Sequence, residues 1–265
     1  MKTDMYCYLE DRTRKSLPSG VQNFKDAFEN WLDPDTTAVA CIDMHRGHVG
    51  PEEQLTCPAP RARVKIAAHD IFHRACRHIG IPIIHVQHWQ RHGGIDDLNS
   101  KQHNRMANWR VLYELYLPPN PTMDQHSWEG TKWLDLMVEE DGRDYYVRTK
   151  KRLSSFFPTD FEFLLRNLNV SNLVLTGTYT DACVLSTAFD AANRDFRVIV
   201  PRDIVAGYSE EAEHAALMII SLHLGLVVDS PALVTEWFAR KGEPSEDVVR
   251  RLSEASGLLE PAGAG

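Results

Sequence analysis

The 265-residue chain has few cysteines, no long apolar run and no excess of positive charge. Its five cysteines are an odd number without CxxC spacing, which fits a reduced cytoplasmic environment better than a disulfide framework. No apolar run approaches the about 20 residues that span a bilayer. The charged stretch 1–15 lacks the apolar centre of a signal peptide. We therefore predict a cytoplasmic protein that does not insert into a membrane.

Positive charge is too scarce for a nucleic-acid-binding surface. The 29 lysines and arginines are outnumbered by 37 aspartates and glutamates, which gives a formal net charge of −8. The only basic run, residues 148–152, directly follows a strand-like segment. Gly93-Gly94 lack the strand-loop-helix context of a phosphate-binding loop. We therefore predict neither a nucleic acid partner nor an organic cofactor.

Strand-like and helix-like segments alternate along the chain, which predicts an α/β protein with a parallel sheet between two helical layers. An arm and a short helix are expected within 1–35, and a frayed tail within 241–265. We expect strands at 38–43, 81–86, 145–149, 173–176, 196–200 and 226–228. We expect helices at 21–31, 58–79, 133–139, 159–168, 183–193 and 209–224.

Three chemically active residues follow three of these strands. Asp43 ends the first strand, Lys150 follows the third, and Cys183 lies at the turn between the fourth strand and a helix. Ligands bind outside the carboxyl ends of parallel strands, so these side chains are expected to meet there. Each also has a plain structural interpretation: a capping aspartate, a solvated loop lysine, and a small residue that packs the helix start.

The three residue types suit nucleophilic catalysis. The start of a helix favours a thiolate at Cys183, which can attack a carbonyl carbon and form a thioester that water hydrolyses. Asp43 can accept the thiol proton and pass it to a leaving amine. Lys150 supplies a positive charge that stabilises carboxylate and thiolate.

Three motifs carry a family resemblance. The first motif is Ile42-Asp43-Met44, and the second, K-x-x-x-S-x-F, is matched by Lys150, Ser154 and Phe156. The third, G-x-x-T-x-x-C-V-x-x-T-A-x-D-A, is matched by Gly177, Thr180, Cys183, Val184, Thr187, Ala188, Asp190 and Ala191. In these motifs the chain resembles the isochorismatase-like cysteine hydrolases, in the branch of N-carbamoylsarcosine, ureidoacrylate and biuret amidohydrolases, from about residue 36 to about residue 240.

The resemblance implies a hydrolase domain at 36–240 with a Rossmann-like αβα fold and six strands in the order 3-2-1-4-5-6. It implies a catalytic triad of Asp43, Lys150 and Cys183, and a cis peptide between Thr178 and Tyr179. The backbone N–H groups of Tyr179 and Cys183 would form the oxyanion hole. Relatives are usually homodimers or homotetramers, and we expect the same here.

Histidines near the predicted site raise the question of a metal. His85, His88 and His92 surround Trp89, and His45 and His48 follow Asp43. The nicotinamidase branch carries D-W-H, where this chain reads His88-Trp89-Gln90. Because the aspartate and second histidine of that pattern are missing, we predict no metal and do not favour nicotinamidase activity.

The intact Cys183 favours cleavage of a small linear amide or ureide, with release of ammonia or an amine. His48, Trp89 and Phe156 are candidate substrate contacts, and each has packing as the alternative. His48 stands where many relatives have an aromatic residue, which favours a ureido or carboxylate group. The alternatives that remain are a vinyl ether hydrolase, a nicotinamidase-like amidase, an inactive binding subunit and a redox sensor. The segment 87–121 is expected to be a lid or an oligomer contact.

Overall fold

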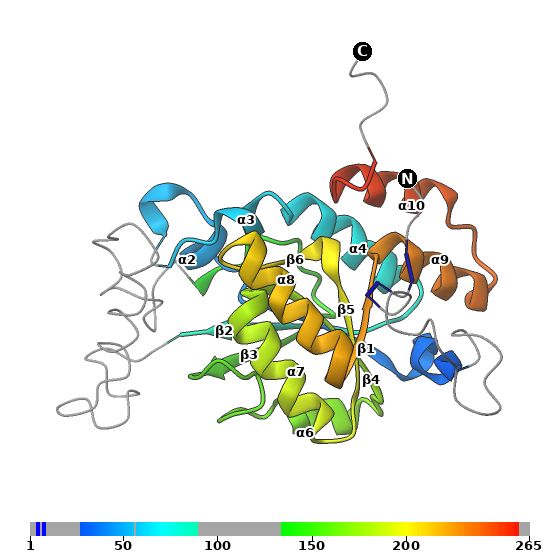
Figure 1. Cartoon of the computed structure of the whole chain (residues 1–265), viewed down its shortest axis with the longest axis horizontal. Helices are drawn as coiled ribbons and strands as arrows, with labels where there is room; N and C mark the ends of the chain where they lie inside the picture. The colour runs from blue at the N-terminus through cyan, green and yellow to red at the C-terminus, as the bar shows by residue number, and fades with distance from the viewer. Residues whose placement is uncertain (1–3, 6, 9–26, 56, 90–133, 260–265) are drawn as a thin grey trace, which may run out of the picture.

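The computed structural model describes residues 4–5, 7–8, 27–55, 57–89 and 134–259 (Figure 1). Its strands form one parallel sheet in the order β3-β2-β1-β4-β5-β7, and the two-residue β6 pairs with β4. The αβα prediction is confirmed, and the six main strands have the predicted order. The strands are β1 (Thr37–Ile42), β2 (Ile83–His88), β3 (Tyr145–Lys150), β4 (Asn172–Thr178), β5 (Arg197–Pro201), β6 (Val205–Ala206) and β7 (Gly225–Val228).

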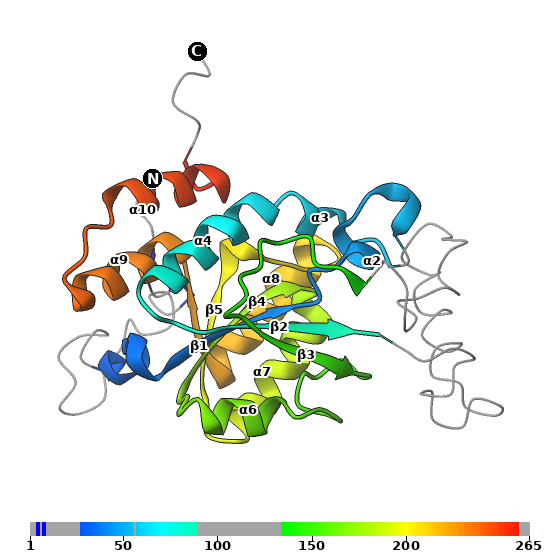
Figure 2. The same ribbon diagram turned by 180° about the vertical axis from the view of Figure 1, so that it is seen from behind.

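Two helical layers cover the sheet. One contains α6, α7 and α8, and the other contains α4, α9 and α10 (Figures 1 and 2). The α-helices are α2 (Arg46–Val49), α3 (Pro60–Arg63), α4 (Ile66–His78), α6 (Phe161–Asn167), α7 (Leu185–Ala192), α8 (Glu210–Ile219), α9 (Ser230–Lys241) and α10 (Glu246–Ala255). The π-helical turns η7 (Thr180–Val184) and η9 (Ile220–Leu224) adjoin α7 and α8, and the 3-10 turns are η1 (Glu29–Leu32), η2 (Pro34–Thr36), η3 (Glu52–Gln54) and η8 (Arg202–Ile204).

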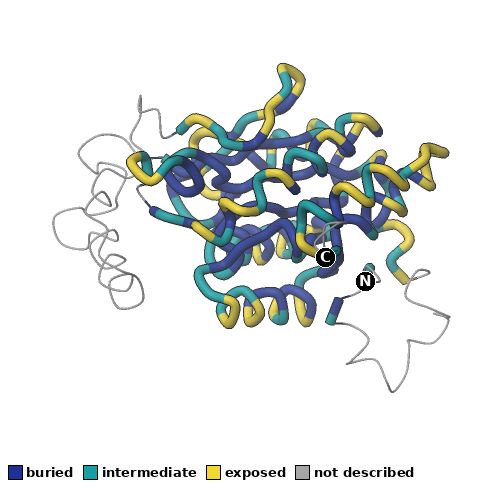
Figure 3. The backbone as a smooth tube through the Cα atoms, turned by 90° about the horizontal axis from the view of Figure 1, so that it is seen from above, coloured by how far each residue is buried: buried dark blue, intermediate teal, exposed yellow. Residues whose placement is uncertain are grey.

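The two faces of β1 belong to different cores. Ala38, Ala40 and Ile42 pack with the layer of α6, α7 and α8, whereas Val39 packs with α4 and α9. Every residue of β1 is buried, as expected for a central parallel strand that reads as a continuous apolar run. In Figure 3 the buried residues (dark blue) lie mainly towards the centre of the molecule, and the exposed residues (yellow) lie mainly at its periphery. This packing fixes the end of β1, where Asp43 begins the candidate site.

Two helix predictions need correction. The helix expected at 58–79 is divided into α3 and α4 by a turn at Val64 and Lys65. The helix expected at 133–139 is wrong, because residues 135–139 are not helical. Leu136 forms an antiparallel bridge with His45, and the Met137 amide donates to the Met44 carbonyl at 3.1 Å. Pairing with the segment after β1 therefore overrides the local helical pattern.

The C-terminal region is more ordered than expected. A frayed tail was predicted from residue 241, but Glu246–Ala255 forms α10 and packs against α4 and α9. Leu252 is fully buried in the same core as Phe72 and Trp237. The sequence prediction missed α10 because its buried face is narrow and most of its residues are polar.

Residues at the N-terminus lie along the edge strand β7. Cys7 forms an antiparallel bridge with Val227, and the Asp4 amide donates to Asp229 Oδ2 at 2.6 Å. Most of the helix predicted at 21–31 and most of the segment 87–121 lie outside the described residues. All five cysteines are buried and free of disulfides, as predicted. Among the described residues, no helix is long and apolar enough to cross a membrane.

Candidate active site

The three residues predicted as a triad meet at the carboxyl edge of the sheet. Lys150 Nζ donates to Asp43 Oδ2 at 2.6 Å and to Cys183 Sγ at 3.3 Å. Asp43 and Lys150 are fully buried, and Cys183 is 8% exposed. Asp43 follows β1 and Cys183 follows β4, so the cluster lies where the strand order reverses, the usual place for a ligand in such sheets.

The backbone at Asp43 has a left-handed conformation, with φ of 57°. Aspartate tolerates this region better than most residues, which suits it to the turn directly after a strand. The Asp43 amide donates to the Val86 carbonyl at 2.8 Å, and the His88 amide donates to Asp43 Oδ1 at 2.8 Å. One carboxylate oxygen is therefore held by an amide of β2 and the other by the Lys150 ammonium.

Close contact between β1 and β4 shapes the turn that carries the nucleophile. Gly177 pairs with Ile42 and has φ of +100°, and a Cβ on it would lie 2.1 Å from the Ile42 carbonyl oxygen. Only glycine fits there without moving β1. The next peptide, Thr178–Tyr179, is cis, as the resemblance implied. The helical segment starts at Thr180, three residues before the predicted start at Cys183.

The resting Cys183 thiol is protonated at neutral pH. Burial, together with the charge of Asp43, raises the pKa of the thiol to about 12, although Lys150 opposes the shift. The raised pKa keeps the proton on the resting sulfur, so stabilisation of the thiolate by the helix start does not outweigh burial, and Asp43 is needed to accept the thiol proton. Burial alone would lower the pKa of Lys150, but Asp43 and Cys183 outweigh it and raise that pKa, so the amine is an ammonium.

The predicted oxyanion donors lie in the turn around the cis peptide. The amides of Ala182 and Val184 both donate to the Tyr179 carbonyl, at 3.1 and 3.0 Å. Those two amides are thus committed within the turn. The candidate donors to a substrate oxygen are then the amides of Tyr179 and Cys183, and their role stays a prediction.

His48 lies against the turn at residues 179–184 that carries Cys183, which we call the nucleophile turn. Its Nδ1 is 2.7 Å from the Cys57 carbonyl oxygen, and its ring meets the Tyr179 ring edge-on at a centroid distance of 5.7 Å. Burial opposes protonation of His48, but contacts with Cys57 and the charge of Asp43 outweigh it and raise its pKa. The structure therefore brings His48 close to the nucleophile turn, and contact of His48 with substrate stays a prediction.

Trp89 and Phe156 have different surroundings. Lys151 Nζ lies 3.5 Å from the centre of the Trp89 ring and donates to the Trp89 carbonyl at 2.7 Å, beside the end of β3. The Phe156 ring packs against Phe161 at 5.0 Å and Phe196 at 5.9 Å. These contacts place Phe156 in the core, which is the packing alternative given above. Contact of Trp89 or Phe156 with substrate stays a prediction.

Tyr208 is a residue near the site that sequence reasoning did not identify. Its ring is stacked on Tyr179 at a centroid distance of 4.1 Å and an interplanar angle of 5°. The Tyr179 hydroxyl donates to the carbonyls of Cys57 and Pro58, at 3.2 and 2.6 Å. The signal that could have indicated such a partner is the large aromatic side chain of Tyr179 within the nucleophile motif, which is 3% exposed and therefore needs neighbours that enclose it.

Two of the histidines noted in the sequence, His45 and His48, lie side by side near the site. The rings of His45 and His48 lie 4.4 Å apart. Within the part of the chain that the structure describes, no three His, Cys, Asp or Glu side chains are placed to hold a metal ion. His92 lies outside the described residues, and the absence of a metal stays a prediction.

Fold and site together define an α/β protein with a buried Asp-Lys-Cys cluster at the switch point of its sheet. The model of the isochorismatase domain matches residues 37–232. The chain therefore belongs to the isochorismatase family, which confirms the resemblance and the expectation of a hydrolase of this family.

Individual relatives agree with this assignment. The chain is 27% identical over 199 residues to an uncharacterized isochorismatase family protein of Bacillus subtilis, covering 72% of this chain and 97% of the relative. It is 30% identical over 229 residues to the ureidoacrylate amidohydrolase RutB of Pseudomonas syringae pv. syringae, covering 81% and 88%. A cysteine hydrolase structure from Pseudomonas syringae pv. phaseolicola has a TM-score of 0.64 at 20% identity, covering 78% of this chain and 94% of that one, which shows the same fold.

Proposed function

We propose that this protein is a cysteine hydrolase that cleaves the C–N bond of a small linear amide or ureide through a thioester. The observation that carries the proposal is the position of Lys150 Nζ, within hydrogen-bonding distance of both Asp43 and Cys183 in a buried site. The likeness to a ureidoacrylate amidohydrolase, over most of both chains, supports an amide or ureide as the substrate class.

The first step is attack of the Cys183 sulfur on the substrate carbonyl carbon. The thiol interacts with Asp43, which takes its proton as the S–C bond forms. Because burial raises the pKa of the thiol, proton removal accompanies the attack in this mechanism. Lys150 stabilises the negative charge as it leaves the carboxylate and passes through the sulfur, and the charge ends on the substrate carbonyl oxygen.

The second half of the reaction releases the products. The amides of Tyr179 and Cys183 hold the oxyanion of the tetrahedral intermediate. When that intermediate collapses, the C–N bond breaks, and Asp43 returns its proton to the leaving nitrogen, which departs as ammonia or an amine. Water then attacks the thioester, Asp43 takes a proton from it, and Cys183 recovers its thiol as the acid product leaves.

Ammonia release from a panel of ureides, carbamoyl amino acids, linear amides and nicotinamide tests this function. We expect turnover of at least one ureide or linear amide, and none by Cys183→Ser. Cys76→Ser is the matched control, because Cys76 is also buried but lies in α4, in the opposite helical layer. A Cys183→Ala variant that kept its activity would instead favour a vinyl ether hydrolase, and no turnover across the panel would contradict the substrate class.

A further inference from the structure

The side chain of Tyr179 is held on three sides. Its ring is stacked on Tyr208, its edge meets His48, and its hydroxyl donates to the carbonyls of Cys57 and Pro58. Only 3% of the residue is exposed. A ring fixed in this way also fixes the peptide that carries it, and that peptide supplies one of the two proposed oxyanion donors.

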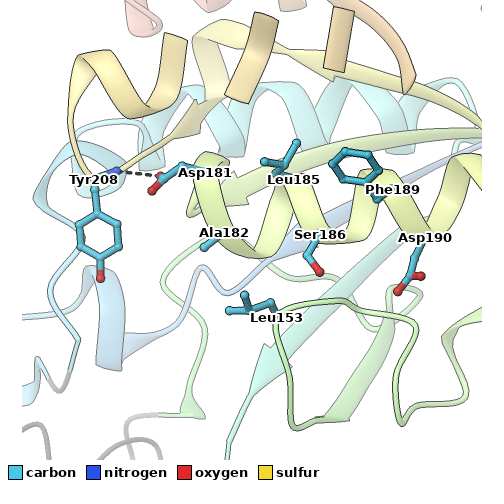
Figure 4. Close-up of a pocket in the computed structure, with 8 residues that line it drawn as sticks. All are labelled: Leu153, Asp181, Ala182, Leu185, Ser186, Phe189, Asp190 and Tyr208. Atoms are coloured by element: carbon cyan, nitrogen blue, oxygen red, sulfur yellow. Dashed lines mark hydrogen bonds between the residues drawn. The ribbon is translucent and has the colours of Figure 1, made fainter. Parts of the chain in front are cut away.

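Tyr208 is itself attached to the nucleophile turn at two points. Its ring contacts Tyr179, and its amide donates to Asp181 Oδ1 at 3.0 Å (Figure 4). Tyr179 and Asp181 flank Thr180, at the start of the turn that leads to Cys183. The loop between β6 and α8 therefore contacts the nucleophile turn on both sides of Thr180.

This loop is firmly anchored on its other side. The Gly207 amide donates to Glu213 Oε2 at 2.7 Å, and Arg61 forms an ion pair with the same oxygen at 3.3 Å. A Cβ on Gly207 would lie 2.8 Å from Asp181 Oδ1. The loop thus rests directly against Asp181, and α3 and α8 hold it there.

We propose that Tyr208 is a positioning residue. It acts through Tyr179 to hold the nucleophile turn, which bears the proposed oxyanion donors Tyr179 and Cys183, in its active geometry. The inference rests on the proposed function, because it assigns Tyr208 to the step in which the Tyr179 amide stabilises the oxyanion. In this arrangement the effect of Tyr208 passes through the stacked ring of Tyr179 to the Tyr179 amide. Loss of the stack should therefore impair oxyanion stabilisation and leave the chemistry of the Cys183 thiol unchanged.

The surroundings of Tyr208 make it a suitable position for substitution. It lines one end of an open groove of about 560 Å³ on the outer side of η7 and α7, together with Leu153, Ala182, Leu185 and Phe189 (Figure 4). A smaller side chain would leave space continuous with this groove, not a sealed cavity, so the cost to folding should be modest.

Comparison of Tyr208→Leu with Tyr208→Phe tests the proposal. Misplacement of a catalytic group by about 1 Å can cost about 100-fold in rate, so Tyr208→Leu should lower kcat by about 10- to 100-fold with KM changed by less than about threefold. Tyr208→Phe keeps the stacked ring and should retain kcat within about threefold. Tyr145→Leu, the same substitution at an exposed tyrosine of β3, is the control. Equal kcat values for wild type and Tyr208→Leu would overturn the proposal.

A second measurement does not depend on the identity of the substrate. Propionaldehyde should protect Cys183 from iodoacetamide by forming a hemithioacetal, in which sulfur bonds to the carbonyl carbon and the thiol proton moves to the carbonyl oxygen. In Tyr208→Leu, the protecting concentration should rise at least about tenfold, because the donor to that oxygen is misplaced, while the alkylation rate without aldehyde stays unchanged. Parallel loss of alkylation and protection would indicate general damage to the site and overturn the positioning role.

The two measurements separate this inference from the proposed function. If wild type turns over no amide or ureide, the proposed substrate class fails, and the aldehyde measurement still decides the role of Tyr208. If Tyr208→Leu does not fold, Asp181→Ala replaces it, because this variant removes the acceptor of the Tyr208 amide and leaves both rings intact. Asp181→Asn keeps an acceptor oxygen and should behave as wild type in both measurements; a loss equal to that of Asp181→Ala would overturn the proposal.

Discussion

Lys150 Nζ lies 2.6 Å from Asp43 Oδ2, and both side chains are completely buried. A buried ion pair is costly to break, since removing one partner leaves an uncompensated charge out of water. The pair is also the part of the site that holds Cys183, because the same ammonium donates to its sulfur at 3.3 Å. Substitutions at Asp43 and Lys150 can therefore separate the contribution of this ion pair to the stability of the protein from its contribution to activity.

The first prediction concerns the ion pair itself. Lys150→Met should abolish turnover and lower the free energy of unfolding by about 3–5 kcal/mol, because Asp43 remains buried without its partner. The double variant Asp43→Asn, Lys150→Met removes both charges and should recover much of that loss while remaining inactive. Urea unfolding of the four proteins in this cycle measures the coupling. Additive destabilisation by the two substitutions would contradict a coupled pair.

The second prediction concerns the pH dependence of thiol reactivity. Because the pKa of Cys183 is raised to about 12, its thiolate fraction is small at neutral pH and rises with pH. The rate of alkylation by iodoacetamide should therefore increase about tenfold per pH unit between about pH 6 and 9, without the plateau of an activated thiolate. Mass spectrometry of the Cys183 peptide measures this rate. A plateau below about pH 8 would show that the resting sulfur is already ionised.

The third prediction concerns acid stability. His69 and His73 are fully buried, and burial lowers the pKa of His69 to about 4 and that of His73 well below its usual value. Both are neutral in the folded state, so the unfolded chain binds more protons below about pH 6.5. Stability should be fully present above about pH 6.5 and decrease as the pH falls towards 4, by roughly 3 kcal/mol for His69 alone.

The substitution His73→Phe checks this assignment. Neither ring nitrogen of His73 has a hydrogen-bond partner among the described residues, so an apolar ring should be tolerated at pH 7. Urea unfolding at pH 7 and pH 5 should show a smaller difference for the variant than for the wild type. Equal differences would indicate that other groups carry the acid sensitivity.

The fourth prediction concerns substrate preference. His48→Phe removes the polar ring that contacts the Cys57 carbonyl beside the nucleophile turn. We expect the ratio of kcat/KM for a ureide over an unsubstituted linear amide to fall by at least about tenfold, because a polar donor is lost from the site. Steady-state kinetics with both substrates measure the ratio. An unchanged ratio would remove His48 from the substrate-binding residues.

Local sequence was sufficient to predict the framework of the site. Asp43 and Cys183 follow central strands, where continuous apolar runs and the rule for carboxyl ends indicate both the sheet and the position of the polar residues. Lys150 was predicted in the same way from the end of β3. These inferences succeeded because they depend on periodicity and on residues close together in the chain.

Other features depend on contacts between distant segments, which periodicity does not show. The raised pKa of Cys183 results from its burial beside Asp43, 140 positions earlier in the numbering. The stack of Tyr208 on Tyr179 joins two loops, and residues 135–139 follow their pairing with the segment after β1 instead of their helical pattern. Such tertiary contacts override local propensity, so only the folded structure identifies them.

The charges of the buried cluster sum to zero at each stage of the proposed reaction. At rest, the Lys150 ammonium balances the Asp43 carboxylate, and the sulfur is neutral. Once the S–C bond has formed and the proton has moved to Asp43, the same ammonium balances the oxyanion of the tetrahedral intermediate, and the carboxyl group is neutral. The negative charge is displaced over a short path while the total stays constant, so the surrounding dipoles need little reorganisation. An uncharged substrate can then be activated in a site that is itself electrically neutral.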